Sequence, residues 1–329
     1  MKKIVLLFPG YGSQFVGMGK ELYNDHRVVQ EYFEQASSCL DINFVKLCFA
    51  SSDVELSKIN HANTALFLIG AAATALLKEY AIPFDMVAGY THGEYTALFA
   101  AGGISFPDGL YLLNKLSGLY QDALGNVDIH ALSVSGVVTQ DLATVCATAS
   151  AQGDYVSIAL HSTKVDHIIV GGSRALETVK EMLKHFEHAK THRVNVESAL
   201  HSPLFDGVVD QFKMYLEKVD FNNIHIPLLR CSDGQAITSD SNIKHHIIEH
   251  INSPVRWDKV MESCADADIL VEMTPGLQLG SMIAGMYPEK RIVTVNTSSD
   301  FEVLKNMLDT QTLIDNPEQS QGTSEGTSE

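Results

Sequence analysis

The chain has 329 residues, a mass of 36.0 kDa and a formal net charge of −17. At about 150 residues per domain, this length predicts two structural units or one unit with an insertion. Hydrophobic residues make up 45% of the chain, enough to bury a substantial core, which excludes wholesale disorder. No apolar run reaches the roughly 18 residues that a membrane span needs. The excess of 40 acidic over 23 basic residues argues against nucleic-acid binding.

Cysteine usage and the N-terminus indicate the compartment. The five cysteines are scattered, odd in number and without CxxC spacing, so we expect reduced thiols, a cytoplasmic location and no metal site. The apolar stretch at residues 4–8 is too short for a signal peptide, and no small-residue cleavage site follows it. We therefore interpret this stretch as a first β-strand.

The first third of the chain alternates short apolar strands with helices. Strands are predicted at 4–8 and 86–89, and the first is followed by a glycine-rich turn. Helices are predicted at about 17–38, 63–79, from 93 onward and 107–124. The segment 63–79 is apolar on all sides, which is typical of a buried helix. This alternation predicts an α/β core with a parallel sheet.

From about residue 128 the pattern changes. Strands are predicted at 130–138, 155–160, 167–172 and 192–196, and helices at 139–150 and 175–187. This order is βαββαβ, the split-βαβ or ferredoxin-like pattern, and it predicts a small inserted subdomain.

The α/β pattern then resumes. Apolar residues lie on one face of a helix at 203–219. Strands are predicted near 226–230, 268–273 and 291–296, and helices near 240–251, 255–265, 277–286 and 300–309. The end of the chain repeats GTSE and has no apolar residue from 316 onward, so we expect a disordered tail.

The segment MVAGYTHGEYTALFAAG (86–102) predicts a candidate catalytic site. A strand runs into Gly-x-Thr-x-Gly and then into a helix, which is the order of a nucleophile elbow with Thr91 in place of the usual serine. The backbone N–H of His92 would point toward the same space at the helix N-terminus. Taken alone, the pentapeptide also fits a glycine-rich turn with a threonine N-cap.

Five motifs in this order extend the interpretation. They are FPGYGSQFVGMGKEL (8–22), the elbow with GEYTALFAAGGISFPDGL (93–110), VESALHSPLF (196–205), INSPVRW (251–257) and VEMTPG (271–276). Together with the inserted unit they resemble the malonyl-CoA:acyl-carrier-protein transacylase family over about residues 1–310. The resemblance implies an α/β-hydrolase-like core at 1–126 and 198–310, a ferredoxin-like subdomain at 127–197, and a tail at 311–329.

The resemblance also implies roles for five residues. The nucleophile of the family matches Thr91, and its general-base histidine matches His201. The two backbone N–H groups of its oxyanion hole match Tyr11 and His92, and the carbonyl that orients the histidine matches His250. In this scheme an imidazole deprotonates a hydroxyl, an acyl ester forms and two N–H donors hold the oxyanion.

The helix after the elbow departs from the family pattern. Members that handle malonyl groups have an arginine there, which pairs with the free carboxylate of malonate. The matching residue here is Leu116, and no arginine occurs between Arg27 and Arg174. Lys115 is one position away, rotated by about 100° on the helix. A carboxylate beside Leu116 would be desolvated without a partner, which costs several kcal/mol, so we expect a neutral acyl group.

The elbow also departs from the family pattern. Its residues adopt a strained backbone in which a β-branched side chain is unfavourable, so we expect Thr91 to react more slowly than a serine. Tyr90 replaces a histidine of the family, and Tyr11 replaces a glutamine. We expect Tyr90 and Leu116 to shape or fill the acyl pocket.

Four other features have explanations simpler than catalysis or metal binding. His245, His246 and His250 have ligand-like spacing, but a polar helix face is the preferred interpretation. We expect a surface loop at His161, a plain turn at SDGQ (232–235) and helix-start stabilisation by Glu94.

The sequence therefore predicts a monomeric acyltransferase or thioester hydrolase without a bound cofactor. Its substrates would be phosphopantetheine thioesters on acyl-carrier protein or, alternatively, on CoA. An ordinary malonyl transferase and a catalytically impaired carrier-protein scaffold remain alternatives. Docking an acidic carrier protein on this acidic chain requires a basic patch, for which the candidates are Lys164, Lys180, Lys184 and Lys190.

Overall fold

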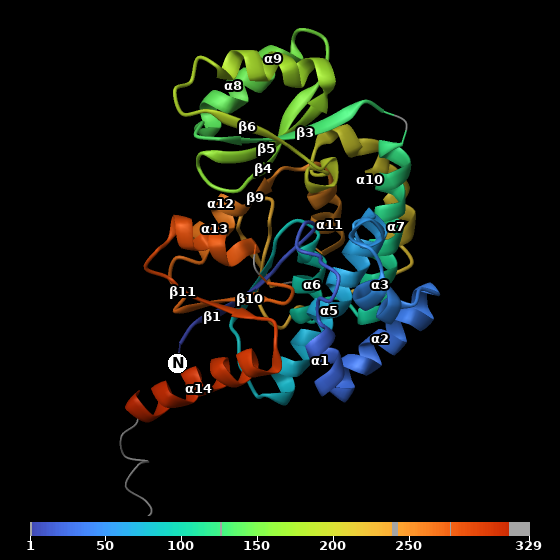
Figure 1. The fold of residues 1–329 in the computed structure, drawn as a ribbon, viewed down its shortest axis with the longest axis vertical. Coiled ribbons are helices and arrows are strands. Elements are labelled where there is room, and N and C mark those ends of the chain that lie inside the picture. Colours follow the sequence, from blue (N-terminus) through green and yellow to red (C-terminus); the bar gives the residue numbers. More distant parts are fainter. Residues whose placement is uncertain (1, 126, 239–242, 277, 316–329) are drawn as a thin grey trace, which may run out of the picture.

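The computed structural model describes residues 2–125, 127–238, 243–276 and 278–315, and side chains up to residue 309. It contains a parallel core sheet and a separate, smaller sheet (Figure 1). The strands are β1 (Ile4–Phe8), β2 (Met86–Gly89), β3 (Ile129–Ser135), β4 (Val156–His161), β5 (Asp166–Gly172), β6 (Lys190–Val194), β7 (Leu228–Leu229), β8 (Ala236–Ile237), β9 (Val255–Arg256), β10 (Ile269–Met273) and β11 (Arg291–Val295).

The helices cover both sheets. They are α1 (Lys20–Asp25), α2 (Arg27–Leu40), α3 (Phe44–Ala50), α4 (Asp53–Leu56), α5 (Ile59–Glu79), α6 (Gly93–Ala100), α7 (Phe106–Leu124), α8 (Thr139–Ser150), α9 (Ser173–Leu183), α10 (Asp206–Leu216), α11 (Ile243–Asn252), α12 (Trp257–Ser263), α13 (Gln278–Met286) and α14 (Ser298–Asp315). Strands alternate with helices along both halves of the core, which confirms the predicted α/β class.

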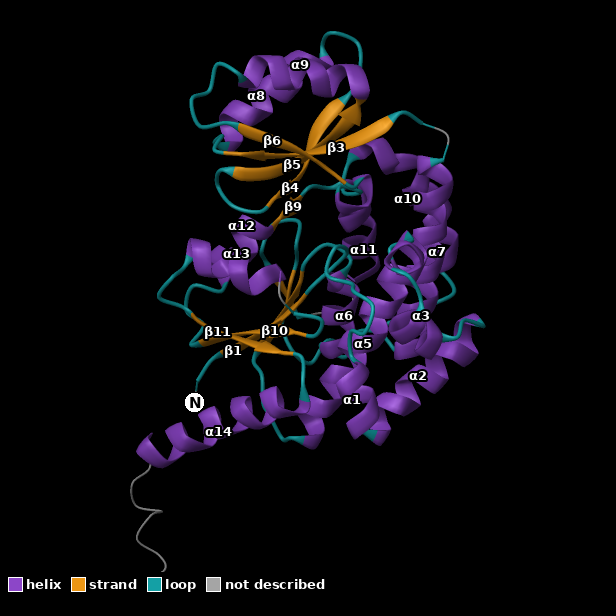
Figure 2. Cartoon of the chain, viewed as in Figure 1, coloured by secondary structure: helices purple, strands orange, loops and turns teal. Residues whose placement is uncertain are grey.

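The core sheet has the strand order β11-β10-β1-β2-β7-β8, and only β8 runs antiparallel to its neighbour. β1 lies at the centre between β10 and β2, and all five of its residues are buried. A parallel strand covered on both faces needs such a continuous apolar sequence. Even-numbered side chains of β1 pack with α5 and α7, and odd-numbered ones pack with α12 and α13. Helices α12 and α13 lie together, apart from α5 and α7 (Figure 2).

Helix α5 is apolar on nearly all sides because it lies inside the core. It is long and apolar enough to cross a membrane by length and composition, but 83% of its apolar window is buried in the fold. Core helices of this kind pass the same test, so the helix is weak evidence for a membrane span. The sequence prediction of a buried helix at 63–79 agrees with this packing.

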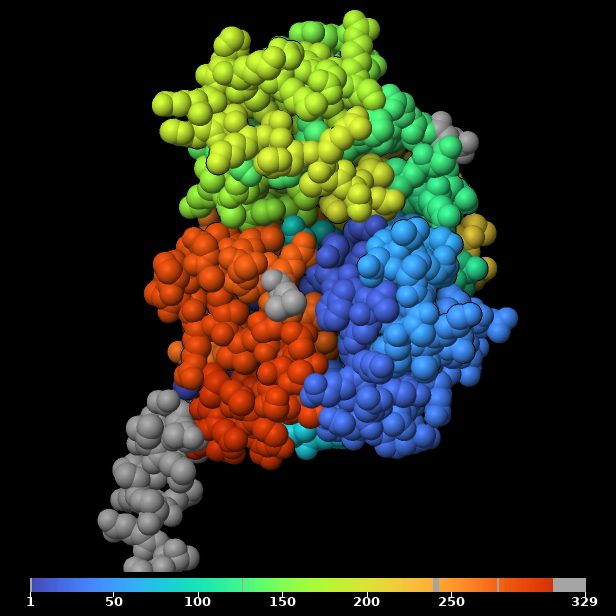
Figure 3. Space-filling view, viewed as in Figure 1, coloured from blue at the N-terminus to red at the C-terminus, as the bar shows by residue number. Residues whose placement is uncertain are grey.

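The smaller sheet has the order β6-β3-β5-β4-β9, and α8 and α9 cover its outer face. It forms a lobe at one end of the core (Figure 3). Its first four strands and two helices follow the βαββαβ order predicted for residues 127–197. β9 comes from the core segment and pairs in parallel with β4, with Leu160 opposite Val255.

Three predicted elements differ from the structure. The helix predicted at 255–265 begins only at Trp257, because Val255 and Arg256 pair with the small sheet. The helix predicted at 17–38 is divided by extended backbone at His26. Residues 311–315, predicted as part of the tail, are helical, because α14 continues to Asp315, just before the Asn-Pro pair that disfavours helix. The predicted tail residues 316–329 lie outside the described residues.

Candidate active site

The turn between β2 and α6 holds Thr91 in a strained backbone conformation. Its φ is 51°, in the left-handed region that a β-branched residue rarely adopts. A Cβ on Gly89 would overlap the backbone nitrogen of Glu94, and one on Gly93 would overlap the carbonyl oxygen of Phe8. Only glycine at these two positions lets strand and helix approach closely enough for the turn. Strain of this kind persists where the surroundings enforce it, which is typical of active sites.

The loop after β1 lies directly against the Thr91 side chain. A Cβ on Gly10 would overlap Thr91 Oγ1. Within the described parts of the chain, neither the Tyr11 N–H nor the His92 N–H has a hydrogen-bond acceptor. The two predicted oxyanion donors thus flank the same side chain, and their N–H groups are free to bind a ligand oxygen.

His201 is held in one tautomer. Its Nδ1 lies 2.8 Å from the carbonyl oxygen of His250. A carbonyl only accepts, so Nδ1 carries the proton and Nε2 keeps a lone pair. Burial lowers the pKa of His250, and the nearby Thr91 carbonyl opposes this shift. His250 therefore links the strained elbow to His201. Thr91 Oγ1 and His201 Nε2 are both buried without a hydrogen-bond partner in the described structure.

Tyr120 on α7 is a positioning residue that the sequence did not reveal. Its hydroxyl lies 3.2 Å from the carbonyl oxygen of Leu200 and 3.3 Å from that of Ile251. These residues directly precede His201 and follow His250. One buried hydroxyl therefore ties together the two segments that hold the candidate base.

The site contains neutral, buried histidines. Burial first, and His250 second, lower the pKa of His201 to about 3. Burial also lowers the pKa of His92, and the nearby His201 and His250 lower it further. The His92 ring lies 5.3 Å from that of His201, and both of its nitrogens lack a hydrogen-bond partner among the described residues. The sequence indicated only the backbone of His92, because nothing local shows where its ring points.

This burial predicts a loss of stability in acid. The folded-state pKa of His201 lies below its ordinary value of 6.5, so the unfolded chain binds a proton that the folded chain does not. The contribution of neutral His201 to the free energy of unfolding is complete above pH 6.5. It is lost as the pH falls toward 3, by about 1.4 kcal/mol per pH unit. In His201→Gln, the free energy of unfolding measured with urea should fall less steeply between pH 6 and pH 4, by roughly 1.4 kcal/mol per pH unit. The matched variant His245→Gln, which removes an exposed histidine, should leave this pH dependence unchanged. An unchanged pH dependence in His201→Gln would refute the lowered pKa of His201.

The position that matches the family arginine is fully buried. Leu116 has no exposed surface and packs in the main core. The neighbouring Lys115 does not replace a cation there, because its ammonium lies 5.7 Å and 5.8 Å from the ring centres of Tyr111 and Tyr215. Tyr215 belongs to α10, so this contact directs Lys115 toward that helix.

The two elbow tyrosines have separate partners. Tyr90 packs edge-on against Trp257 with ring centres 5.2 Å apart, and burial raises its pKa to about 12, although the nearby Ser162 opposes this shift. Tyr11 donates to the carbonyl oxygen of Ser57 at 2.8 Å. Both side chains therefore fill space between the core and its neighbouring segments. Whether Tyr90 borders the acyl chain stays a prediction.

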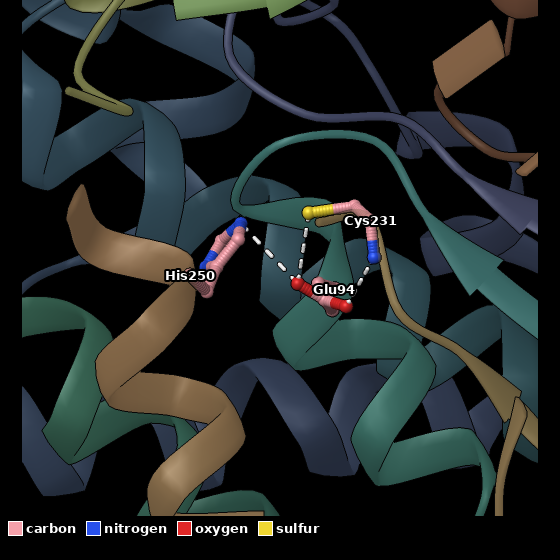
Figure 4. Close-up of side chains that lie close together, drawn as sticks. All are labelled: Glu94, Cys231 and His250. Atoms are coloured by element: carbon pink, nitrogen blue, oxygen red, sulfur yellow. Dashed lines mark hydrogen bonds and ion pairs between the residues drawn. The ribbon is translucent and has the colours of Figure 1, made fainter. Parts of the chain in front are cut away.

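Behind the elbow lie four residues that we call the Glu94 cluster: Glu94, Cys231, His246 and His250. Figure 4 shows three of them, Glu94, Cys231 and His250. The predicted polar helix face is wrong for His246 and His250, which are 3% and 2% exposed and face Glu94 because they lie one turn apart on α11. Glu94 does more than stabilise a helix start. Although burial opposes it, His246 and His250 lower the pKa of Glu94 to about 2.

His161 is also placed differently from the prediction. It lies on β4 rather than in a surface loop, is 6% exposed, and its Nδ1 lies 3.1 Å from that of His167. The strand pairing of β4 with β5 buries it. The SDGQ segment is a turn between β7 and β8, as predicted.

Comparison with known proteins identifies the family. A family model described as "Acyl transferase domain" matches residues 5–289. The chain belongs to the acyl transferase domain family. This confirms the predicted class of enzyme and its relation to the malonyl-CoA:acyl-carrier-protein transacylases.

Individual relatives of this acyl transferase are distant but cover nearly the whole chain. It is 27% identical over 305 residues to the malonyl CoA-acyl carrier protein transacylase of Bacillus subtilis (strain 168), which covers 92% of this chain and 96% of the relative. An acyl carrier protein S-malonyltransferase structure from Vibrio cholerae matches with a TM-score of 0.87 and 27% identity, over 92% of this chain and 99% of the other. FabD from Acinetobacter baumannii, at 24% identity over 94% and 99%, has a TM-score of 0.88 and shares the fold.

Proposed function

We propose that this acyl transferase moves acyl groups carried as phosphopantetheine thioesters, in the cytoplasm, through an acyl ester on Thr91 with His201 as base. The donor is an acyl-carrier protein or an acyl-CoA, and the acceptor is a second thiol or water. The acyl group is neutral rather than malonyl. The names of the curated relatives include the acyl carrier protein, which supports this carrier.

The observation that carries the proposal is the coupling of Thr91 to His201 through His250. The His250 carbonyl fixes the His201 tautomer, and the His250 ring lies near the Thr91 carbonyl. Thr91 thus combines a strained backbone with a hydroxyl oxygen that has no hydrogen-bond partner among the described residues, and the Nε2 lone pair of His201 has none either. A nucleophile and its general base need such free groups within hydrogen-bond reach of each other.

The proposed reaction has two half-steps. His201 Nε2 takes the Thr91 hydroxyl proton as Oγ1 attacks the thioester carbonyl, and the Tyr11 and His92 N–H groups bind the oxyanion. The C–S bond then breaks, and the thiol leaves with the proton from Nε2. In the second half-step an incoming thiol or water gives its proton to Nε2 and attacks the acyl ester, which releases Thr91.

The proposed preference for neutral acyl groups rests on the lack of a cation at the position of Leu116. Leu116 is apolar and buried, and Lys115 lies against two tyrosine rings. Arg256 is held by Asp258 in a fork of 2.9 Å and 2.8 Å, and Arg230 pairs with Asp233. A malonyl carboxylate in this environment would lose its hydration without gaining a free cation.

Competition among acyl thioesters tests this preference. With equal acetyl-, butyryl- and malonyl-CoA, or the same groups on acyl-carrier protein, loading of a neutral group should exceed malonyl loading by roughly 10-fold or more. Intact mass spectrometry of the quenched protein reads the products directly. Faster malonyl loading would support an ordinary malonyl transacylase, as the curated relatives are named, and would overturn our assignment of specificity.

Three of the four lysines in the predicted docking patch form ion pairs. Lys164 pairs with Glu262, Lys180 with Glu177, and Lys184 with Glu181. An acidic carrier protein would therefore compete with these glutamates for the lysines. We expect docking to be weak and sensitive to salt, since exposed ion pairs of this kind contribute little.

A further inference from the structure

The Glu94 cluster brings metal-ligand chemistry together at one buried point. Glu94 Oε2 lies 3.0 Å from Cys231 Sγ and 3.3 Å from His250 Nε2 (Figure 4). One ligand atom each from Glu94, Cys231 and His250 fall within 4.8 Å of one another. The three side chains come from α6, from the segment after β7 and from α11, and none is more than 4% exposed.

We propose that Glu94, Cys231 and His250 form a buried site for a divalent transition metal of the zinc class. Thiolate and imidazole ligands favour zinc over magnesium or calcium, which prefer oxygen. On binding, the Cys231 thiol releases its proton and forms a metal–sulfur bond, while His250 binds as a neutral ligand. The carboxylate and the thiolate then balance the two positive charges, so the buried site is neutral overall.

The separations suit tetrahedral coordination. Zinc lies about 2.3 Å from sulfur and about 2.0–2.2 Å from nitrogen or oxygen, so neighbouring ligand atoms are roughly 3.3–3.6 Å apart. The observed separations of 3.0 Å and 3.3 Å need only small side-chain movements to reach these values. A cavity of about 10 Å³ is lined in part by Glu94, His246 and His250, and it offers room for a water as fourth ligand.

The outer contacts orient the ligands as metal sites require. The His250 ring lies near the Thr91 carbonyl, and its Nε2 has no hydrogen-bond partner in the described structure, so the lone pair of Nε2 is available to a ligand. The second carboxylate oxygen, Oε1, accepts from the Cys231 N–H at 2.9 Å and lies 2.9 Å from His246 Nε2. A ligating histidine that donates its other N–H to a carbonyl, and a supported carboxylate, are typical outer-shell features.

The Nε2 atom of His250 is a second observation that points to a ligand. In the part of the chain that the structure describes, it is buried without an aligned hydrogen bond. Such groups are rare in folded proteins and cost free energy unless something binds them. A metal at this point would satisfy His250 Nε2 and would tie α6, which begins at the elbow, to the segment that orients His201.

Metal binding can be measured without any acyl substrate. Untagged full-length protein is stripped with a chelator, desalted and given one equivalent of Zn²⁺ or Co²⁺. We expect about one metal per chain to survive a second desalting step, as measured by elemental mass spectrometry. Co²⁺ should give the visible bands of tetrahedral cobalt and a thiolate-to-cobalt charge-transfer band in the near ultraviolet, and Zn²⁺ should raise the melting temperature.

Variants identify the ligands. Cys231→Ser should abolish the charge-transfer band and reduce bound metal at least 10-fold, as expected for loss of a ligand. The controls Cys39→Ser and His245→Gln remove an exposed thiol and an exposed histidine next to the site, and both should bind like the unmodified chain. If Cys231→Ser does not fold, the cobalt spectrum of the unmodified chain decides alone. No retained metal, no charge-transfer band, or equal binding by Cys231→Ser would overturn the proposal, whatever the acyl-transfer assays show.

Discussion

Replacing Thr91 by alanine is expected to lower the rate at which butyryl thioester is consumed by about 10³-fold or more. The reason is that the hydroxyl held against the Gly10 loop at the elbow would be lost, while binding and the N–H donors would remain. Quenched reactions with excess butyryl thioester and an acceptor thiol, in which the remaining thioester is measured by chromatography, give this rate. His201→Ala should cost a similar factor, and the double variant should be little worse than either single variant, because the two groups act as a unit.

The matched control at this position is Thr91→Ser, which keeps the hydroxyl. Serine lacks the methyl group that crowds the oxygen and disfavours a φ of 51°. If about 1 kcal/mol of strain is relieved in the reactive state, acylation should become roughly 5-fold faster. A serine variant that is slower than the unmodified chain would show that the threonine methyl positions the hydroxyl. Equal inactivity of the unmodified chain and of Thr91→Ser is the outcome expected of a carrier-protein scaffold.

Leu116→Arg should shift acyl selectivity toward malonyl. A guanidinium that reaches the malonate carboxylate forms a charge-assisted fork, which contributes on the order of 1.5–3 kcal/mol. This corresponds to roughly 10- to 150-fold in the ratio of malonyl to butyryl loading. The ratio is measured in a single competition experiment, so a general loss of activity does not affect it.

Because Leu116 is fully buried, the arginine can also disturb the core. Leu116→Met keeps the volume and adds no charge, so it should leave the loading ratio unchanged. A folded Leu116→Arg protein with an unchanged ratio would show that Leu116 lies away from the acyl carboxylate. A large shift in Leu116→Met would show that packing, rather than charge, sets the ratio.

The parts of the fold that the sequence predicted well are those determined locally. β1, β2 and the elbow are short apolar runs that meet glycine-rich turns, so their type and position follow from residues within one segment. The inserted lobe was predicted for the same reason, since each of its strands alternates and each helix has one apolar face. β9 could not be predicted, because two residues become a strand only through pairing with β4.

The candidate site likewise has a part that the local sequence predicts and a part that it does not. Thr91 and its glycines are adjacent in sequence, so the pentapeptide predicts them directly. His201 and the His250 carbonyl came from the family resemblance, and their hydrogen bond spans 49 positions. The Glu94 cluster was missed because its side chains converge from three separate elements. The spacing of His246 and His250 was the only signal, and it does not show whether that helix face turns inward.

The central claim, an acyl ester on Thr91, is tested most directly by locating the acyl group. The unmodified chain is mixed with stoichiometric butyryl thioester, quenched in acid within one turnover, and examined by intact mass spectrometry and peptide mapping. Our account predicts one butyryl group per chain on the peptide that contains Thr91, stable to acid and released by hydroxylamine at alkaline pH. A butyryl group on a cysteine, or no adduct during a turnover that consumes thioester, would contradict it.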